Sequence, residues 1–436
     1  MSSKRAGPWW KCAAKTLGPG VVTGASDNDP SGIATYAQAG ALYGFGMVWT
    51  APVVLPLMIA AQEMSDRTAA ATGKSIGAIV RERFPRAGRI TVGILLVLLL
   101  VSNTVNLSAD LMAVGGGMEL LGAGPAQLWS ALAGLAIAVL LVAGSYRIVS
   151  RIFTGLCLAL FTYVAVMFVA HVDWLEVLKG LSFQQLTGDL PYWGLVAGVF
   201  GTSISPYLFF WESGQRVEEM RAEKRHGGPS AVPGRDMPLH RAHRRRNERR
   251  IDVVTGMTLS VVVMFAVIVA TGATLGQHGQ SIQTAADAAK ALSPIAGPLA
   301  GAVFAVGFIG TGLLGVPVLA SAACIGLSSL TGKSWGFERS VRRAPVFYGL
   351  VLLGTVGGTL LASLFPNPMT MLVLSAMINA VAAAPFLVVV LLIARSRKIM
   401  GNARNGVLSN VLGWTTAGAM AVCGVLALWS QLAGSH

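Results

Sequence analysis

Eleven mostly apolar stretches of about 20 or more residues constrain the fold of this chain more than any other feature. A helix of about 20 residues crosses the roughly 30 Å hydrocarbon core of a bilayer. Backbone polar groups in that core must be satisfied internally, which favours helices. We therefore predict an all-α integral membrane protein. Its transmembrane helices, about 11 in number, are expected at residues 19–43, 46–70, 90–122, 127–146, 150–171, 192–218, 253–275, 294–329, 342–365, 368–395 and 407–432.

The low charge content supports the same class. Charged residues make up 12% of the 436 residues and hydrophobic residues 54%, whereas soluble domains carry about 25% charged residues. The basic start of the chain is not followed by a compact apolar core with a small-residue cleavage site, so we expect no cleaved signal. Residues 1–18 are then a segment that precedes the first span.

Basic residues alternate between the two sides of the predicted bundle. Counting from the first span, every second loop is rich in Arg and Lys, and the loops on the other side contain only Lys179 and Lys290 as basic residues. The positive-inside rule places the basic loops, the amino terminus and residues 1–18 in the cytoplasm, and an odd number of spans places the carboxyl terminus outside. Attraction to anionic lipids at the cytoplasmic face explains the net charge of +14 without nucleic acid as a partner. The basic loops are residues 81–86, 146–151, 216–250, 339–343 and 395–398.

The loop at residues 216–250 is longer than the others. It contains eleven basic and five acidic side chains, and its Gly- and Pro-rich middle has no apolar period. Three histidines also lie here, and metal capture by them is one interpretation. A solvated basic loop against an anionic leaflet is the interpretation we prefer.

The first span contains residues that are costly in a bilayer. Asp27 and Asp29 lie in mid-segment, and Asp29 directly precedes Pro30. A charge near the bilayer centre costs about 2.5–3.5 kcal/mol. Proline also removes a backbone donor and disfavours helix at the preceding residue. One interpretation is a solvated loop before the span. The other is a broken helix whose freed carbonyls and Asp29 carboxylate hold a cation.

The sixth span carries a similar interruption. Pro206 falls in mid-span among small polar residues, with Glu212 a little further on. Paired interruptions at matching places in two halves indicate a secondary-transporter site made of unwound helices. We therefore predict two inverted five-helix repeats, residues 19–171 and 192–395, with broken helices 1 and 6. An extra helix follows at residues 407–432.

Residues Asp29 to Gly40 read Asp-Pro-Ser-Gly-Ile-Ala-Thr-Tyr-Ala-Gln-Ala-Gly. This resembles the first helix of the NRAMP (natural resistance-associated macrophage protein) divalent metal transporters, where Asp-Pro-Gly-Asn precedes Ala-Thr and Gln-Ala-Gly. The segment Ile204-Ser205-Pro206-Tyr207 is similar to the family's Val-Met-Pro-His, with only the proline retained. Weaker similarity covers most of the chain. The resemblance implies a LeuT-like transporter in a prokaryotic plasma membrane, and not an enzyme.

The resemblance also implies a metal site. Asp29 matches the family's metal-binding aspartate, and Gly32 falls where the family has an asparagine ligand. Thr202 falls where a backbone carbonyl binds metal, and Ser205 replaces a methionine thioether. No cofactor is expected, because the divalent cation is the transported substrate.

Two of these departures change the expected chemistry. A thioether is a soft ligand that favours transition metals, whereas Gly32 and Ser205 leave room for oxygen and water. One carboxylate with carbonyls and bound waters suits Mg²⁺, which dehydrates reluctantly. The pattern is similar to the NRAMP-related magnesium transporters. We therefore predict an importer of hydrated Mg²⁺, Mn²⁺ or both, working by alternating access between the two repeats.

Proton coupling is expected to be weak or absent. Tyr207 stands where the family has a histidine implicated in proton movement. Asp110 in the third span and Glu212 are possible proton carriers, with Asp27 close to the site, but each is equally well explained as a buried, hydrogen-bonded acid. Asn379 in the tenth span either lines the pathway or hydrogen-bonds between helices, and we favour the second role.

Other functions stay open at this point, because a fold does not define a substrate. One is a proton-coupled Mn²⁺ or Fe²⁺ transporter of the NRAMP type, and another is a sodium-coupled carrier of a small organic solute on the same scaffold. The third is an intramembrane enzyme or receptor with Asp27 and Asp29 as a catalytic pair. Carboxylates two residues apart face different sides of a regular helix, which disfavours the third.

Overall fold

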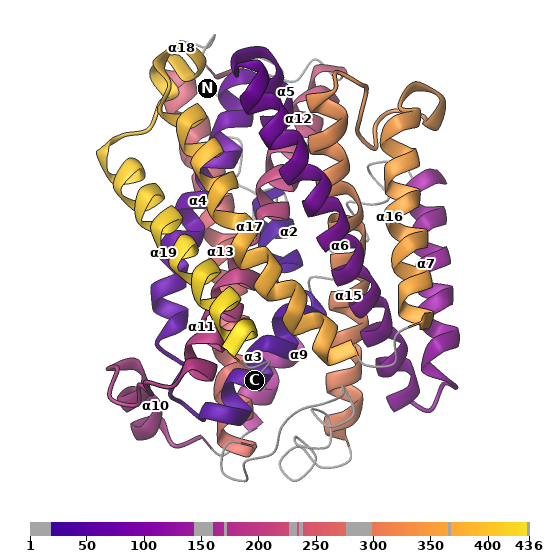
Figure 1. The fold of residues 1–436 in the computed structure, drawn as a ribbon, viewed down its shortest axis with the longest axis vertical. Coiled ribbons are helices and arrows are strands. Elements are labelled where there is room, and N and C mark those ends of the chain that lie inside the picture. The colour runs from indigo at the N-terminus through magenta and orange to yellow at the C-terminus, as the bar shows by residue number, and fades with distance from the viewer. Residues whose placement is uncertain are drawn as a thin grey trace, which may run out of the picture.

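The computed structural model describes residues 19–143, 160–169, 172–225, 233–234, 239–275, 299–364 and 368–433. All regular structure in this part of the chain is helical (Figure 1). The helices are α2 (Pro19–Ser26), α3 (Pro30–Tyr43), α4 (Thr50–Thr72), α5 (Ile76–Arg83), α6 (Arg86–Leu120), α7 (Ala126–Ala143), α9 (Leu160–Val169), α10 (Trp174–Leu181), α11 (Leu190–Ser203), α12 (Pro206–Arg225), α13 (Leu239–Thr274), α15 (Leu299–Leu330), α16 (Pro345–Leu364), α17 (Pro368–Arg395), α18 (Arg397–Met400) and α19 (Val407–Ala433).

Each of the eleven predicted spans contains helix in the structure. The first is divided into α2 and α3, and the sixth into α11 and α12, so both predicted breaks are confirmed. Within the described residues, seven helical segments are individually long and apolar enough to cross a membrane. The two halves of the first span are each too short to meet that criterion alone, because the break interrupts them.

The predicted loop at residues 216–250 is shorter in the structure than expected. Helix α12 continues to Arg225, and α13 begins at Leu239, so the loop's basic ends are helical. The prediction used hydropathy, which marks only the apolar part of a helix. Arg, Lys and Glu are themselves good helix formers and carry both helices beyond it. Most of the Gly- and Pro-rich middle lies outside the described residues.

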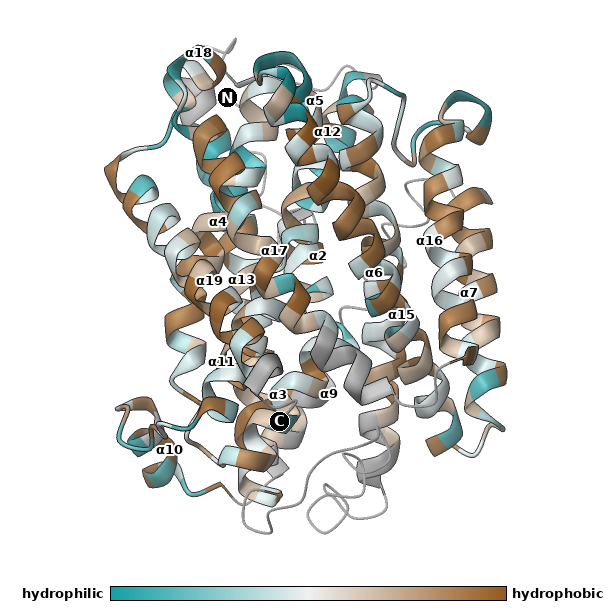
Figure 2. Cartoon of the chain, in the orientation of Figure 1, coloured by the Kyte–Doolittle hydropathy of each residue, from teal (hydrophilic) through white to brown (hydrophobic). Residues whose placement is uncertain are grey.

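Apolar side chains cover the outside of the bundle, while polar side chains are buried inside it. Figure 2 shows brown, hydrophobic surfaces along the helices and teal, hydrophilic residues at their ends. This distribution suits a lipid environment, because lipid tails are themselves apolar and no hydrophobic effect drives apolar side chains away from them. Exposed apolar residues of the outer helices include Ile94 and Leu98 of α6, Leu135 of α7, Leu360 of α16 and Val425 of α19.

The backbones of α2 and α13 approach each other closely at two glycines of α2. A Cβ atom added at Gly24 would lie 2.1 Å from the carbonyl oxygen of Gly256, and one at Gly20 would lie 2.8 Å from the backbone of Val253. Gly20 and Gly24 form a small-xxx-small pair, which lets two helix backbones approach closely in a membrane protein. The first half of the broken helix is therefore held along α13 by backbone contact.

The two ends of the bundle differ. Helices α5 and α18 lie at one end, and α10 lies at the opposite end (Figure 1). Helices α5 and α18 carry basic residues in their last turns. We call the end with α5 and α18 the basic end.

Candidate functional site

The first break lies between Ser26 and Pro30. In a continuous helix, the backbone N–H of residue 30 would bond to the Ser26 carbonyl, but proline has no N–H. Asp29 takes an extended backbone conformation (φ −66°, ψ 166°) and caps α3, its side chain accepting a hydrogen bond from the Gly32 backbone N–H at 2.8 Å. The sequence thus ends one helix and starts the next within three residues.

The Asp29 carboxylate accepts hydrogen bonds from four groups. Its Oδ1 accepts from the Ser31 hydroxyl at 2.6 Å as well as from the Gly32 N–H, and its Oδ2 accepts from the Asn106 amide at 3.0 Å and the Tyr207 hydroxyl at 3.3 Å. Asp29 is only 1% exposed. All four donors are neutral, so hydrogen bonds orient the carboxylate without neutralising its charge.

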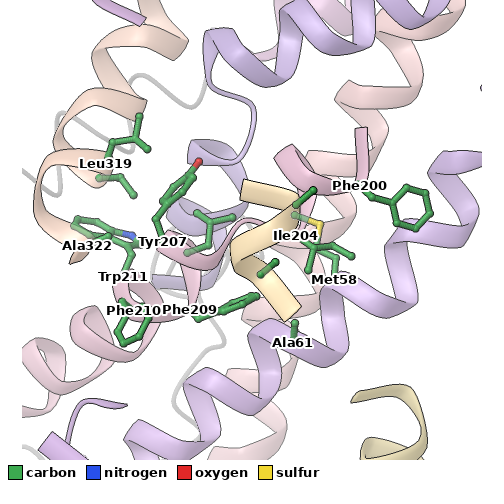
Figure 3. Packing of buried hydrophobic residues seen from close by; sticks show 14 of the residues in the cluster. Met58, Ala61, Phe200, Ile204, Tyr207, Phe209, Phe210, Trp211, Leu319 and Ala322 are labelled. Atoms are coloured by element: carbon green, nitrogen blue, oxygen red, sulfur yellow. The ribbon is translucent and has the colours of Figure 1, made fainter. Parts of the chain in front are cut away.

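The second break has the same cause as the first. Pro206 leaves the Thr202 carbonyl without its helical donor. The Ser205 hydroxyl lies 2.7 Å from the Thr202 carbonyl oxygen and 2.8 Å from that of Gly201. In this conformation Ser205 therefore turns back onto its own helix. Figure 3 shows Ile204 and Tyr207 on either side of this break, with Phe209, Phe210 and Trp211 packed around the start of α12.

The two breaks face each other. The Tyr207 hydroxyl of α12 reaches the freed Ser26 carbonyl at 3.4 Å as well as the Asp29 carboxylate. A Cβ atom at Gly32 would lie 3.3 Å from the Thr202 hydroxyl and 3.1 Å from the Asp27 carbonyl. A Cβ atom would be tight there, so the two breaks approach each other closely beside Gly32, which has no side chain.

Asp110 of α6 lies beside this group. It is 0% exposed. Neither of its carboxylate oxygens has a hydrogen-bond partner of ordinary geometry among the described residues, although the Ser31 backbone N–H faces it. A Cβ atom at Gly315 of α15 would lie 2.9 Å from Asp29 Cβ and 3.3 Å from Asp110 Oδ2. Gly315 thus allows α15 to approach both acids.

Asp27 contacts a different helix from those that Asp29 contacts. Its Oδ2 accepts a hydrogen bond from the Ser260 hydroxyl of α13 at 2.6 Å, whereas Asp29 faces α6 and α12. The two acids therefore have different partners, as their spacing predicted, and they do not form a catalytic pair. We use the name central acid group for Asp27, Asp29 and Asp110.

A second buried charge cluster lies further along α12. Arg216 forms ion pairs with Asp66, with Glu219 and, at 3.3 Å, with Asp252, and Arg249 lies 3.5 Å from Asp66. We call these five residues the Arg216 cluster. Each acid of the cluster has an arginine partner.

The Arg216 cluster also holds the start of α2. Asp252 accepts hydrogen bonds from the backbone N–H groups of Gly20 at 3.0 Å and Val21 at 3.3 Å, which are unpaired donors in the first turn of α2. One turn further on, Thr23 donates to Glu212. Glu212 is buried, and the charged groups that it faces are Asp66, Arg216 and Asp252. The structure thus places Glu212 beside the Arg216 cluster and not beside Asp29.

Asn379 of α17 forms a hydrogen bond to another helix. The Ser102 hydroxyl of α6 donates to its side-chain oxygen at 3.4 Å, which joins α6 to α17. The hydrogen bond between helices is thus present, and a role of Asn379 in the transport pathway stays a prediction.

Two residues of the site were missed by sequence reasoning. The Ser26 carbonyl could have been found, since it lies four residues before Pro30. Asn106 could not, because its contact with Asp29 spans 77 residues of sequence and no local pattern encodes it. The Asn106 side-chain oxygen is buried without a partner among the described residues.

The fold and the site define a class. Two proline-broken helices meet at the centre of a membrane bundle, and this is the site architecture of secondary transporters. Residues 20–430 match the Natural resistance-associated macrophage protein-like family, Nramp, and the chain belongs to that family. The predicted family resemblance and the prediction of a transporter instead of an enzyme are confirmed at this level.

Named relatives are bacterial. The chain is 24% identical over 436 residues to the "Divalent metal cation transporter MntH" of Deinococcus radiodurans, covering 96% of this chain and 90% of the relative. It is 23% identical over 406 residues to the protein of the same name from Bacillus subtilis, covering 92% and 88%.

Solved structures support the fold. A mutant of the manganese transporter from Eremococcus coleocola matches with a TM-score of 0.74 at 18% identity, covering 100% of this chain and 90% of that one. Mhp1, described as a nucleobase-cation-symport-1 family transporter, matches with a TM-score of 0.61 at 14% identity, covering 95% and 91%. These likenesses confirm the predicted LeuT-like, all-helical membrane fold.

Proposed function

We propose that this protein is a secondary transporter of divalent metal cations that binds its ion between the breaks of helices 1 and 6. The observation that carries this proposal is that the breaks made by Pro30 and Pro206 meet at Asp29: the Tyr207 hydroxyl reaches both Asp29 and the freed Ser26 carbonyl, and Thr202 lies beside Gly32. Asp29 has no cationic partner among the described residues. The names of the bacterial relatives support the same substrate class.

The proposed ligands are Asp29, the Thr202 carbonyl and the positions of Gly32 and Ser205, to which we add the Ser26 carbonyl. All of these groups offer oxygen or leave space for water, and none offers sulfur or nitrogen. No cluster of three His, Cys, Asp or Glu side chains suited to a metal exists within the described ranges. An oxygen-only site with one central carboxylate favours hydrated Mg²⁺, with Mn²⁺ as a second substrate.

The proposed mechanism is alternating access between the two repeats, residues 19–171 and 192–395. In the present conformation Asp29 and Thr202 are 1% and 2% exposed, so the site is closed to both sides. Opening toward either side would require α2 and α3, or α11 and α12, to separate from their neighbours. The protein would open to one side to bind the ion, open to the other side to release it, and return empty.

We propose that the basic end faces the cytoplasm of a prokaryotic cell and that transport is inward. The positive-inside rule supports this orientation, because α5 and α18 at this end carry Arg and Lys. Anionic lipids would bind the same basic residues. The carboxyl terminus would lie outside.

Substrate binding tests the central proposal through Asp29→Asn. Asparagine retains helix capping but removes the charge, so this variant should fold. Its Mg²⁺ and Mn²⁺ affinity should fall by about 100-fold or more, which is a larger loss than is typical when a residue that only orients a metal ligand is changed. The matched control is Asp173→Asn, because Asp173 also caps a helix, and this helix, α10, lies at the end of the bundle opposite the basic end. Isothermal titration should show unchanged binding in the control. Wild-type affinity in Asp29→Asn would contradict the proposal.

Ion preference tests the hard-ligand part of the proposal. In proteoliposomes, Mg²⁺ uptake should be inhibited by Mn²⁺ more than by Cd²⁺, and Ser205→Met should shift the preference toward Cd²⁺ because a thioether is soft. If Ser205→Met shows no gain in Cd²⁺ preference, the proposal that Ser205 lines the ion site is contradicted. Tight Cd²⁺ binding by the wild type would favour the alternative, a proton-coupled Mn²⁺ or Fe²⁺ transporter.

Proton coupling is proposed to be weak or absent, because Tyr207 is not a readily titrating group. Mg²⁺ entry into proteoliposomes should leave the internal pH unchanged when a pH-sensitive dye is enclosed. Acidification in step with Mg²⁺ entry, lost in Asp110→Asn, would contradict this. Uptake of an organic solute with sodium, without any divalent ion binding, would support the solute-carrier alternative instead.

A further inference from the structure

Asp27 is a buried acid that the proposed divalent site does not use. It is 0% exposed, and its Oδ1 has no hydrogen-bond partner among the described residues. Its single side-chain hydrogen bond joins Oδ2 to the Ser260 hydroxyl of α13 at 2.6 Å. The carboxylate therefore faces α13, on the side of the first break that Asp29 does not face.

The surroundings of Asp27 offer neutral oxygens. A Cβ atom at Gly32 would meet both the Asp27 carbonyl oxygen, at 3.1 Å, and the Tyr36 ring of α3, at 3.5 Å. The Tyr36 hydroxyl is paired with the Ser203 hydroxyl of α11 at 2.8 Å. Asn28, next to Asp27 in the break, also has a buried side-chain oxygen without a partner among the described residues. These are hard oxygen donors, and no Lys, Arg or His forms an ion pair with Asp27 in the described part of the chain.

Charge balance makes the same point. Asp27, Asp29 and Asp110 are all buried, and a buried charge is costly unless it is compensated. A divalent ion at Asp29 supplies two positive charges for three carboxylates. An ion at Asp29 would leave Asp27 without a cation of its own, since the printed partner of the Asp27 carboxylate is the neutral Ser260 hydroxyl of α13.

We propose that Asp27 and Ser260 form a second cation site, between the first break and α13, that takes a monovalent alkali cation, with Na⁺ as the ion of choice. A singly charged ion would balance the one carboxylate, and the hydroxyl and carbonyl oxygens of the break would complete its shell. This inference rests in part on the proposed function, because the charge balance assumes a divalent ion at Asp29.

Binding of ²²Na⁺ to the purified full chain, freed of divalent ions with EDTA, tests the site. Wild-type protein should bind ²²Na⁺ saturably, and NaCl should raise its melting temperature relative to choline chloride at equal ionic strength. Asp27→Asn should weaken binding at least tenfold, and Ser260→Ala should weaken it by a smaller factor. Asp29→Asn is the matched control and should retain ²²Na⁺ binding.

The possible results separate this inference from the proposed function. Absence of saturable ²²Na⁺ binding in wild-type protein that still binds Mg²⁺ overturns the second site alone. Loss of ²²Na⁺ binding in Asp29→Asn but not in Asp27→Asn places Na⁺ at the first site and also overturns it. Should Asp27→Asn fail to fold, Asp27→Glu and Ser260→Ala decide the matter, since a shifted or shortened ligand must change the Na⁺ affinity.

Discussion

The central acid group and the Arg216 cluster are both buried collections of carboxylates, yet they are compensated in different ways. In the Arg216 cluster, Asp66, Asp252 and Glu219 each pair with an arginine. In the central acid group, the described residues offer Asp27 and Asp29 only neutral donors. The fold supplies counter-charges where the acids hold helices together. It supplies none where, in our proposal, the positive charge arrives and leaves as substrate.

The largest expected effect comes from removing the shared arginine. Arg216→Met would leave Asp66 and Asp252 buried with less compensation, and breaking such a pair costs about 3–5 kcal/mol. We expect a large fall in melting temperature and in the yield of folded protein. Lys74→Met is the control, because the Lys74–Glu82 pair is partly exposed, at 42% and 34%, and should contribute little to stability. Equal effects in both variants would contradict the contrast between the two regions.

A smaller effect is expected at Gly24, in the helix that joins the two regions. Helix α2 starts at the Arg216 cluster and ends at the first break. Gly24→Ala would place a Cβ atom 2.1 Å from the Gly256 carbonyl oxygen and push α2 away from α13, at a cost of about 1–3 kcal/mol. Thermal unfolding should show this loss. Gly418→Ala in α19, where a Cβ atom meets nothing within 4 Å, should be neutral or slightly stabilising.

The smallest effect is expected for the neutral hydrogen bonds of the central acid group. Tyr207→Phe removes one donor to Asp29 but no charge, so stability should fall by about 1 kcal/mol and Mg²⁺ affinity should change only a few-fold. Tyr43→Phe is a matched control, since its hydroxyl donates to Asp189 at the same distance of 3.3 Å but in an exposed position. A Tyr207→Phe variant as impaired as Asp29→Asn would show that the phenol is a principal ligand.

The sequence predicted both breaks, because proline acts locally: Pro30 and Pro206 each remove a donor from their own helix. Other features depend on contacts between distant segments and could not be predicted. Asn106 reaches Asp29 only because α6 packs beside the break. The close approach at Gly32 likewise follows from how the two broken helices meet. Hydropathy also underestimated α13, whose first turns are basic.

The most direct test of the central claim compares charge removal in the two regions without any metal ion. In EDTA, at a pH where the acids would be ionised, Asp110→Asn should raise the melting temperature, because it relieves a buried, uncompensated charge. Asp252→Asn should lower it, because it leaves Arg216 with less compensation and removes one of the two oxygens that accept from the backbone N–H groups of Gly20 and Val21. Added Mg²⁺ should raise the melting temperature of the wild type by mass action. Shifts of the same sign in both variants would contradict the account.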